Sequence, residues 1–493
     1  MRGGPPGLEA GPALAPGRVL AHGLVTRSDL PVPFWVAQYG AAVVLLGSFA
    51  LLGLLWRAPR FERGGGLTLP ATLARAAAAP ATRVALRALG LGLAAVTVVV
   101  AVAGPPSAFG NPAPTWFYVW FWVGLVPASL LLGPVWRALN PLRTLARGLA
   151  VLSGDPREEG ARPPPVRLGY WPAAAGLAAF AWLELVWADP EDPRTVLVFL
   201  GVYALAQLGA SMRYGQAWFD RGDAFEAYST LVGQLAPLGR PPAGDGPRTG
   251  RTGPRPERLL VSERRSGTRP AAPTVTTDRP PDPPLVLRNP LRGLAAIPPA
   301  PGLVALVCVL LGSTGFDGLS STAWWSELAA GGGQGTSVLL ATAGLAASIG
   351  VVAVTYALAI RLAGALAGDR KPDLPGLFAH TLLPIGLGYV AAHYLTLLVF
   401  QGQAGYILAS DPLGRGWDLF GTAGWQIDTQ AVPAATLALV QVAAIVLGHV
   451  LGAVAAHDRA VALFPPRAAR RSQYALLGVM VAYTITGISL LLG

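Results

Sequence analysis

The sequence predicts an all-α protein, a polytopic transmembrane helix bundle of about ten spans. Apolar stretches recur along the whole chain, each near or above the roughly 20 residues that a helix needs to cross the hydrocarbon core. The composition is 53% hydrophobic and only 13% charged, which excludes a typical soluble enzyme. The arginines gather in every second connection between the apolar stretches, as in multi-pass proteins of the cytoplasmic membrane.

The predicted spans fall into two sets of five. The first set covers residues 34–56, 82–103, 116–136, 170–187 and 196–212. The second set covers residues 294–312, 337–363, 374–400, 432–457 and 474–492. Each stretch is too long and too evenly apolar to be the exposed helix of a soluble domain. Tryptophans such as Trp56 and Trp136 stand at span ends, where amphipathic rings favour the headgroup level.

The arginine pattern predicts the orientation. The connections after spans one, three, five, seven and nine are rich in arginine, whereas residues 104–115 and 315–336 contain no basic residue. By the positive-inside rule the arginine-rich connections are cytoplasmic, so both termini face outward, although Arg18 and Arg27 run against this assignment at the N-terminus. The net charge of +11 is therefore a signal of topology. We expect no nucleic-acid partner, because no basic segment is interleaved with aromatic residues in a foldable domain.

Four segments organise the chain. Residues 1–33 form an outer tail, residues 34–240 a first five-span half with amphipathic cytoplasmic segments, and residues 285–493 a second half. Residues 241–284 between the halves are rich in Pro, Gly, Thr and Arg, so they bury too little apolar surface to fold and predict a disordered cytoplasmic linker. This linker is either a solvated spacer or an arginine-rich segment that rests on anionic lipid. No apolar core precedes the signal-peptidase-like residues 19–21, so the tail predicts either an imprecise start or a flexible outer segment.

Motifs for soluble chemistry are missing or coincidental. Cys308 is the only cysteine, which excludes intrachain disulfides and Cys-x-x-Cys-His haem attachment. Gly90-x-Gly92 and Gly386-x-Gly388 match part of a dinucleotide pattern, but each lies inside a predicted span and instead indicates close helix packing. The tetrapeptide Asn-Pro-Leu-Arg occurs at residues 140–143 and 289–292, where proline predicts a helix boundary.

The histidines are the most informative residues. Four of the five lie in spans eight and nine, namely His380, His393, His449 and His457. Ionisable side chains within a span are costly and are by default functional candidates. We expect His380 and His449 to lie at similar depth, where they meet if their helices pack together. His380 and His393 are about 220° apart around one helix, so they face different partners, and His457 is expected to be hydrogen-bonded at the interface.

Acidic residues mark the outer side of the bundle. Glu184 is expected to extend toward the interface. The outer loop at residues 401–430 is long and predicts either a functional lid or an interfacial cap, and Asp317 belongs to the same side. In this loop Trp417 and Trp425 are expected to pack down, while Arg415 pairs with one of the aspartates Asp411, Asp418 and Asp428. Span six is interrupted by Pro298 to Pro301 and ends early at Gly312, so it either lines a cavity or is a short tilted span.

Several motifs resemble those of one protein family. They are Gly-Leu-Val-Pro-Ala-Ser at 124–129, Leu-Leu-Gly-Ser-Thr-Gly-Phe-Asp-Gly at 310–318, Ala-His-Tyr at 392–394, Ala-Ser-Asp-Pro-Leu-Gly at 409–414 and Ala-His-Asp-Arg-Ala at 456–460. Together with Asn-Pro-Leu-Arg they look like a family of actinobacterial multi-pass membrane proteins often labelled fenitrothion hydrolase. The resemblance covers nearly the whole chain except the linker, and it implies hydrolysis of organophosphates. Metal-assisted phosphotriester cleavage needs several His and carboxylates converging on metal ions, and no sequence motif supplies them.

Three functions remain open from the sequence. The first is a transporter or permease whose path is lined by spans six, eight and nine, with His380, His393, His449 and Asp317 binding substrate or protons. The second is a membrane redox component that holds haem b or a transition metal between His380 and His449. The third is the phosphotriester hydrolase that the resemblance implies. Expected partners are the lipid bilayer, a small substrate or ion, and possible membrane subunits.

Overall fold

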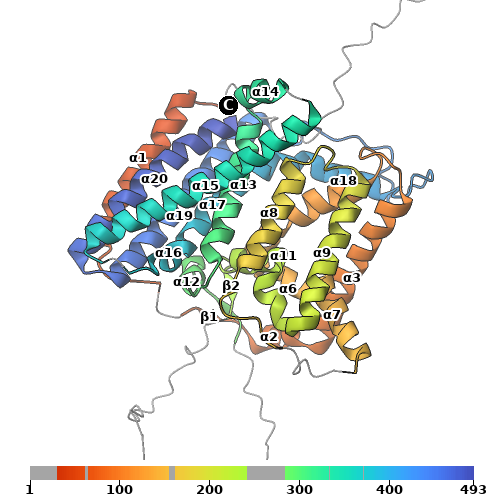
Figure 1. Ribbon diagram of the computed structural model, residues 1–493, viewed down its shortest axis with the longest axis horizontal. Coiled ribbons are helices and arrows are strands. Elements are labelled where there is room, and N and C mark those ends of the chain that lie inside the picture. The colour runs from red at the N-terminus through yellow and green to blue at the C-terminus, as the bar shows by residue number, and fades with distance from the viewer. Residues whose placement is uncertain are drawn as a thin grey trace, which may run out of the picture.

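The computed structural model describes residues 30–61, 65–154, 162–240, 284–331, 333–369 and 371–492, and it confirms the all-α fold. Almost all of the predicted linker at 241–284 and of the tail at 1–33 lies outside these residues. Figure 1 shows the helices packed as two groups side by side.

The first part of the chain forms most of one group. Its helices are α1 (Phe34–Leu55), α2 (Ala71–Ala78), α3 (Pro80–Ala103), α4 (Pro112–Thr115), the π-helix η2 (Trp116–Val123), α5 (Leu125–Leu132), α6 (Val135–Leu139), α7 (Pro141–Leu152), α8 (Trp171–Leu185), α9 (Pro193–Tyr214), the 3-10 helix η3 (Gly215–Trp218), α10 (Phe219–Gly222) and α11 (Ala224–Gly233). Several start where an asparagine or aspartate precedes proline. At Asn111, Asn140 and Asp192 the side chain accepts a backbone N–H of the first turn while proline occupies the first helical position.

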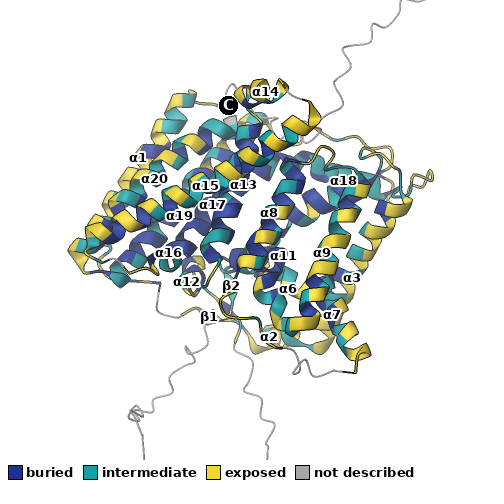
Figure 2. Ribbon diagram, in the orientation of Figure 1, coloured by how far each residue is buried: buried dark blue, intermediate teal, exposed yellow. Residues whose placement is uncertain are grey.

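The second part of the chain contains the most deeply buried of the long apolar helices. Its helices are α12 (Pro290–Ala295), α13 (Leu303–Ser320), α14 (Ala323–Ala330), α15 (Gln334–Ala367), α16 (Leu374–Phe378), the 3-10 helix η4 (Ala379–Leu382), α17 (Leu383–Thr396), the π-helix η5 (Leu397–Gln401), α18 (Gly402–Ala409), α19 (Ala434–Leu463) and α20 (Pro466–Leu492). The apolar windows of α13 and of the α16–α18 segment are 72% buried, whereas that of α15 is 11% buried. Figure 2 shows the same contrast, so α13 and α17 form the centre of the molecule.

Nine helical segments of the described chain are long and apolar enough to cross a membrane. The remaining predicted span is α8, whose 15 helical residues fall short of a full span. Phe34 at the start of α1 and Leu491 at the end of α20 pack in one hydrophobic cluster. Both described ends of the chain therefore lie at the same face, as an even number of crossings requires.

The five-plus-five division holds along the sequence but not in space. We call α1, α13, α15, α17, α19 and α20 the α19 group, and α3, η2, α5 to α9 and α11 the α9 group. α1 leaves the first half and packs on α19 and α20, where Gln38 donates to Ser489 at 2.7 Å. The connection from α1 to α3 is long enough to bridge the groups, which join chiefly through α8 against α13.

A small antiparallel sheet closes one face of the bundle, and the sequence did not predict it. Its strands are β1 (Leu67–Thr68), β2 (Leu238–Gly239) and β3 (Val286–Leu287), in the order β1-β3-β2. β2 ends just before residue 241 and β3 begins just after residue 283. The sheet thus holds both ends of the long connection between the halves beside the connection from α1 to α3.

Candidate functional site

Buried polar side chains gather where the two helix groups meet. We call this set the central cluster. Its members are Glu184 on α8, Tyr228 on α11, Asp317 on α13, and Tyr389, His393, Tyr394 and Thr396 on α17. Each is at most 8% exposed. Ionisable groups inside a membrane protein are expensive to bury and mark function by default, so this cluster is the candidate site.

Asp317 and His393 form the hydrogen-bonded pair of the central cluster. Nε2 of His393 lies 2.9 Å from Oδ2 of Asp317, and Tyr394 donates its hydroxyl hydrogen to the same oxygen at 3.0 Å. The sequence singled out both residues but placed Asp317 beyond the end of span six. α13 instead continues to Ser320, which carries Asp317 inside the bundle.

Span six differs from its prediction because glycines allow close packing. The helix starts at Leu303, after the prolines, and runs through Gly312. A Cβ at Gly312 would lie 2.5 Å from Cα of Ile349 on α15. The residue that appeared to end the helix therefore lets a neighbouring helix approach its backbone.

Glu184 is buried, which corrects the expectation that it extends to the interface. It is 7% exposed, and its Oε1 atom has no hydrogen-bond partner among the residues that the structure describes. Asp317, Tyr118 and Tyr394 lie within electrostatic range of its carboxyl group. A buried carboxyl without full hydrogen bonding is costly unless it is neutral or binds a cation.

Three hydroxyl groups of the central cluster also lack partners. They belong to Tyr228, Tyr389 and Thr396. The ring of Tyr389 stacks on that of His393, with centroids 5.8 Å apart, and a Cβ at Gly318 would lie 2.6 Å from the Tyr389 hydroxyl. Unsatisfied buried polar atoms are rare in folded proteins, and their concentration here indicates a place for water, an ion or a substrate.

Two π-helices border the central cluster. η5 follows Thr396 directly, and η2 carries Trp116 and Trp120, whose indole N–H groups donate to the carbonyls of Gly405 and Gly402 at 2.9 Å each. π-helical turns occur frequently at functional sites because they displace backbone carbonyls from the regular ladder. The two indoles hold α18 against the α9 group.

A second buried polar network lies inside the α9 group, where two short helices begin. Asn140 caps the start of α7 and Asp223 caps the start of α11. The two caps meet, because Asn140 donates to Asp223 at 2.9 Å and to Glu226 at 3.0 Å. The hydroxyl of Tyr203, near the middle of α9, donates to Asp223 at 3.0 Å, so the chain has turned back into the bundle after α9.

Arg143 supplies a positive charge to this network, which we call the paired helix starts. Its guanidinium contacts Glu226 twice, at 2.6 and 3.0 Å, and Asp220 at 2.7 Å. Glu226 is fully buried and Arg143 is 5% exposed. The second Asn-Pro-Leu-Arg also begins a helix, α12, but its Arg292 is half-buried and bonds only the carbonyl of Gly65 among the contacts described.

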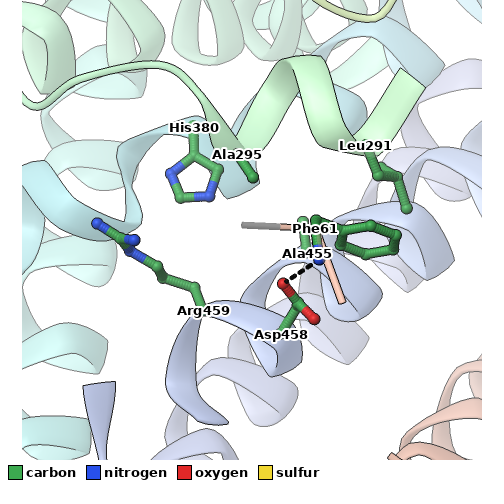
Figure 3. Close-up of a pocket in the computed structure, with 7 residues that line it drawn as sticks. All are labelled: Phe61, Leu291, Ala295, His380, Ala455, Asp458 and Arg459. Carbon is green, nitrogen blue, oxygen red and sulfur yellow. Dashed lines mark hydrogen bonds between the residues drawn. The ribbon is translucent and has the colours of Figure 1, made fainter. Parts of the chain in front are cut away.

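The structure separates His380 from His449. His449 shares a hydrogen bond with the carbonyl of Ile445 through Nδ1 at 2.9 Å, and its Nε2 atom has no partner. His380 lies in η4 and lines a pocket of about 10 Å³ with Asp458 and Arg459 (Figure 3). That volume holds one water molecule at most, so the pocket is too small for haem. In the described chain no three His, Cys, Asp or Glu side chains are grouped to hold a metal ion.

His457 is hydrogen-bonded, as predicted. Its ring contacts Gln473 at 3.0 Å and the carbonyl of Trp56 at 2.9 Å. The neighbouring Asp458 accepts the indole N–H of Trp56 at 2.9 Å and the backbone N–H of Arg60 at 2.6 Å. These residues fasten the end of α1 to α19 and explain why α1 joins the α19 group.

The outer loop is ordered, but it does not cover span six as a lid. α18 packs on α4 and η2 of the α9 group. The expectation that the tryptophans pack down is wrong, because Trp417 is 39% and Trp425 is 58% exposed. α18 and Leu413 lie against the α9 group, whereas Ile427 near the end of the loop packs in the cluster of α1, α17 and α19.

The aspartates of the loop shape its turns. Asp411 accepts the backbone N–H groups of Arg415 and Gly416, Asp418 accepts that of Ala423, and Asp428 accepts that of Gln430. Partial desolvation raises the pKa of Asp411, but hydrogen bonds from the following backbone amides outweigh it and hold the pKa below its ordinary value. The Arg415 guanidinium lies over the ring of Trp417, 5.5 Å from its centroid, so its described side-chain contact is aromatic and not an aspartate.

Three of the four glycines of the loose dinucleotide pattern, Gly90, Gly386 and Gly388, lie at helix contacts as predicted, whereas Gly92 has no atom within 4 Å of its ideal Cβ position. A Cβ at Gly388 would lie 2.5 Å from the carbonyl oxygen of Ala444 on α19, and Gly90 contacts the carbonyl of Leu139.

Comparison with protein-family models, curated proteins and solved structures found no match.

Sequence reasoning missed the paired helix starts. It treated the residues after span five as a cytoplasmic connection. The available signal was Asp223 and Glu226, three residues apart in an otherwise apolar stretch. That spacing is typical of a cap followed by an acidic residue in the first turn of a helix.

Proposed function

We propose that this chain is a membrane transporter whose path passes the central cluster. The observation that supports this proposal is that buried, incompletely hydrogen-bonded polar groups concentrate between two separately packed helix groups. Transporters commonly bind their substrate and coupling ion at the junction of two helix bodies, which rock against each other around the site.

The contacts between the groups suit such a movement. α8 packs on α13, and Glu184 and Asp317 lie on these two helices. The π-helices η2 and η5 supply irregular backbone next to the cluster, which is tolerated at membrane depth where it lines a cavity or is buried in protein. Asp317 and His393 keep the roles expected of them, while His380 and His449 lie apart from this path.

Two-sided accessibility of the central cluster tests the proposal without knowledge of the substrate. Thr396→Cys, in a Cys308→Ala background, is treated with a membrane-impermeant thiol reagent in right-side-out and in inside-out vesicles. A transporter exposes the site alternately, so we expect labelling from both sides. Asp317→Asn should shift the ratio of the two labelling rates by altering the balance between the two states.

Thr484→Cys is the matched control. Thr484 is a buried threonine on α20 whose hydroxyl, unlike that of Thr396, has a described partner, the carbonyl of Met480. It should stay unlabelled from both sides. Labelling of Thr396→Cys from one side only, in the presence and absence of Asp317→Asn, would contradict alternating access.

The redox function has one supporting observation, the unpartnered Nε2 atom of buried His449. That atom could ligate a haem or metal together with a group supplied by a partner subunit. An absorption band of bound haem, or stoichiometric metal, that disappears in His449→Ala would favour this function over transport. The hydrolase function would require turnover of a phosphotriester that is lost in Asp317→Asn.

A further inference from the structure

Glu184 combines deep burial with missing hydrogen bonds. It lies one residue before the end of α8, is 7% exposed, and its Oε1 atom has no partner. An ionised carboxylate in such a place would lose its hydration without receiving a replacement. A proton on the carboxyl group removes this cost.

The groups that face Glu184 come from every element around it. α13 contributes Asp317, α17 contributes Tyr394 and His393, and η2 contributes Tyr118. α11 contributes Tyr228. α10 carries Asp220 and Arg221, and Arg221 lies over the ring of Tyr170 at the opposite end of α8. α15 contributes the hydroxyl of Thr342, which accepts a hydrogen bond from the indole N–H of Trp182. Asp317, which lies within electrostatic range of Glu184, is thus a second acid that is already hydrogen-bonded to His393, and two neighbouring carboxyl groups disfavour double ionisation.

From this geometry we infer that Glu184 is the proton carrier of the transporter, so that the coupling ion is H⁺. The inference rests on the proposed function and names its coupling ion. In the occluded state the Glu184 carboxyl is protonated. When the helix groups part and water enters, its O–H bond breaks, the proton passes to water, and the carboxylate becomes hydrated. Closure toward the other side requires that a proton return to the same oxygen.

The hydroxyl groups without partners fit this role. Tyr389 lies within electrostatic range of Asp317, Tyr228 within range of Tyr394, and Thr396 about one helical turn beyond His393 on α17. Each hydroxyl offers a donor and an acceptor. They can hydrogen-bond the water molecules that take the proton from Glu184. Asp317 stays bonded to His393 and Tyr394, which leaves Glu184 as the group that exchanges its proton with water.

Infrared spectroscopy of the purified full chain in lipid tests the assignment. The C=O stretch of a protonated carboxyl group is distinct from the carboxylate bands and shifts in D₂O. We expect such a band at neutral pH in the unmodified protein, its loss in Glu184→Gln, and its return at a shifted position in Glu184→Asp. Glu327→Gln, which alters an exposed glutamate on α14, should leave the band unchanged.

Each other outcome overturns the inference. No protonated-carboxyl band at neutral pH, or a band that persists in Glu184→Gln, would show that Glu184 is ionised. Loss of the band when Na⁺ replaces choline at constant pH would show that a metal cation occupies the site. The accessibility experiment on Thr396→Cys is independent: two-sided labelling without the band contradicts only the coupling ion, whereas one-sided labelling with the band contradicts only the transporter.

Discussion

At the scale of single residues, the central cluster is held together by one carboxylate oxygen. Oδ2 of Asp317 is hydrogen-bonded to Nε2 of His393 and accepts a second hydrogen bond from the hydroxyl of Tyr394. Hydrogen bonds to charged groups contribute about 1.5–3 kcal/mol each, and removing one partner of a buried pair exposes the other to an unfavourable environment. Single-atom substitutions should therefore have measurable effects on stability.

Tyr394→Phe should lower the free energy of unfolding by about 1.5–3 kcal/mol, because it removes one hydrogen bond to Asp317 without removing the ring. The measurement is denaturant unfolding in detergent, with Tyr474→Phe as control. Tyr474 is 58% exposed, so its hydroxyl should contribute little. Equal effects of the two substitutions would argue against a strong bond at Asp317.

At the scale of elements, glycine contacts set how closely helices approach. α17 crosses α19 at Gly388 and Gly448, where a Cβ on Gly388 would lie 2.9 Å from Cα of Gly448. Neither helix can move aside easily, since Gln441 of α19 also donates to the carbonyl of Ala392 at 2.9 Å. The position of His393 between the helix groups depends on this crossing.

Gly388→Ala should lower stability by about 1–3 kcal/mol through overpacking. Gly92→Ala on α3 is the matched control, because no atom lies within 4 Å of its ideal Cβ position. This control should be neutral or slightly stabilising, since alanine is the better helix former. Thermal unfolding of both variants measures the two changes in stability. An unchanged stability of Gly388→Ala would show that the two helices can separate without cost.

The paired helix starts are a second test at this scale. Arg143→Met should cost about 3–5 kcal/mol, because it leaves Glu226 buried and without its cation. Arg292→Met alters the same tetrapeptide at a half-buried position whose described bond is to the carbonyl of Gly65, so it should cost at most about 1.5 kcal/mol, the contribution of one hydrogen bond. The double variant Arg143→Met/Glu226→Leu should recover part of the loss. A double variant less stable than Arg143→Met alone would refute the ion-pair account.

At the scale of the whole molecule, the arginine pattern and the fold agree on which connections share a face. The start of α1 and the end of α20 lie at one face, and the small sheet closes the other. The arginine-rich connections predict that the face with the sheet is cytoplasmic.

Cysteine labelling in a Cys308→Ala background tests this orientation. Ser326→Cys on α14 should react with an impermeant reagent from outside intact cells, whereas Ser153→Cys after α7 should react only in inside-out vesicles. Both positions are exposed. Reaction of Ser153→Cys from outside would reverse the predicted topology.

The sequence by itself determined the class of fold, most of the spans and the close packing at Gly388. These follow from local properties, namely apolar length, arginine distribution and the size of a side chain. Asn140 and Asn289 could likewise be recognised as helix boundaries, because a cap and its proline act within one turn. Asp317 and His393 were identified as candidates because an ionisable residue among apolar neighbours is visible in the sequence.

Only the tertiary structure decided which of these residues meet. It paired Asp317 with His393, buried Glu184 beside them, joined Asn140 to Asp223 and moved α1 into the other helix group. It also parted His380 from His449 and placed α18 of the outer loop against the α9 group. The physical reason is that each span satisfies its own backbone hydrogen bonds. The sequence pattern therefore leaves open how each helix is rotated about its axis and which helix it packs against. Glycine contacts and a few long-range polar bonds choose among the arrangements, and these depend on atoms far apart in the chain.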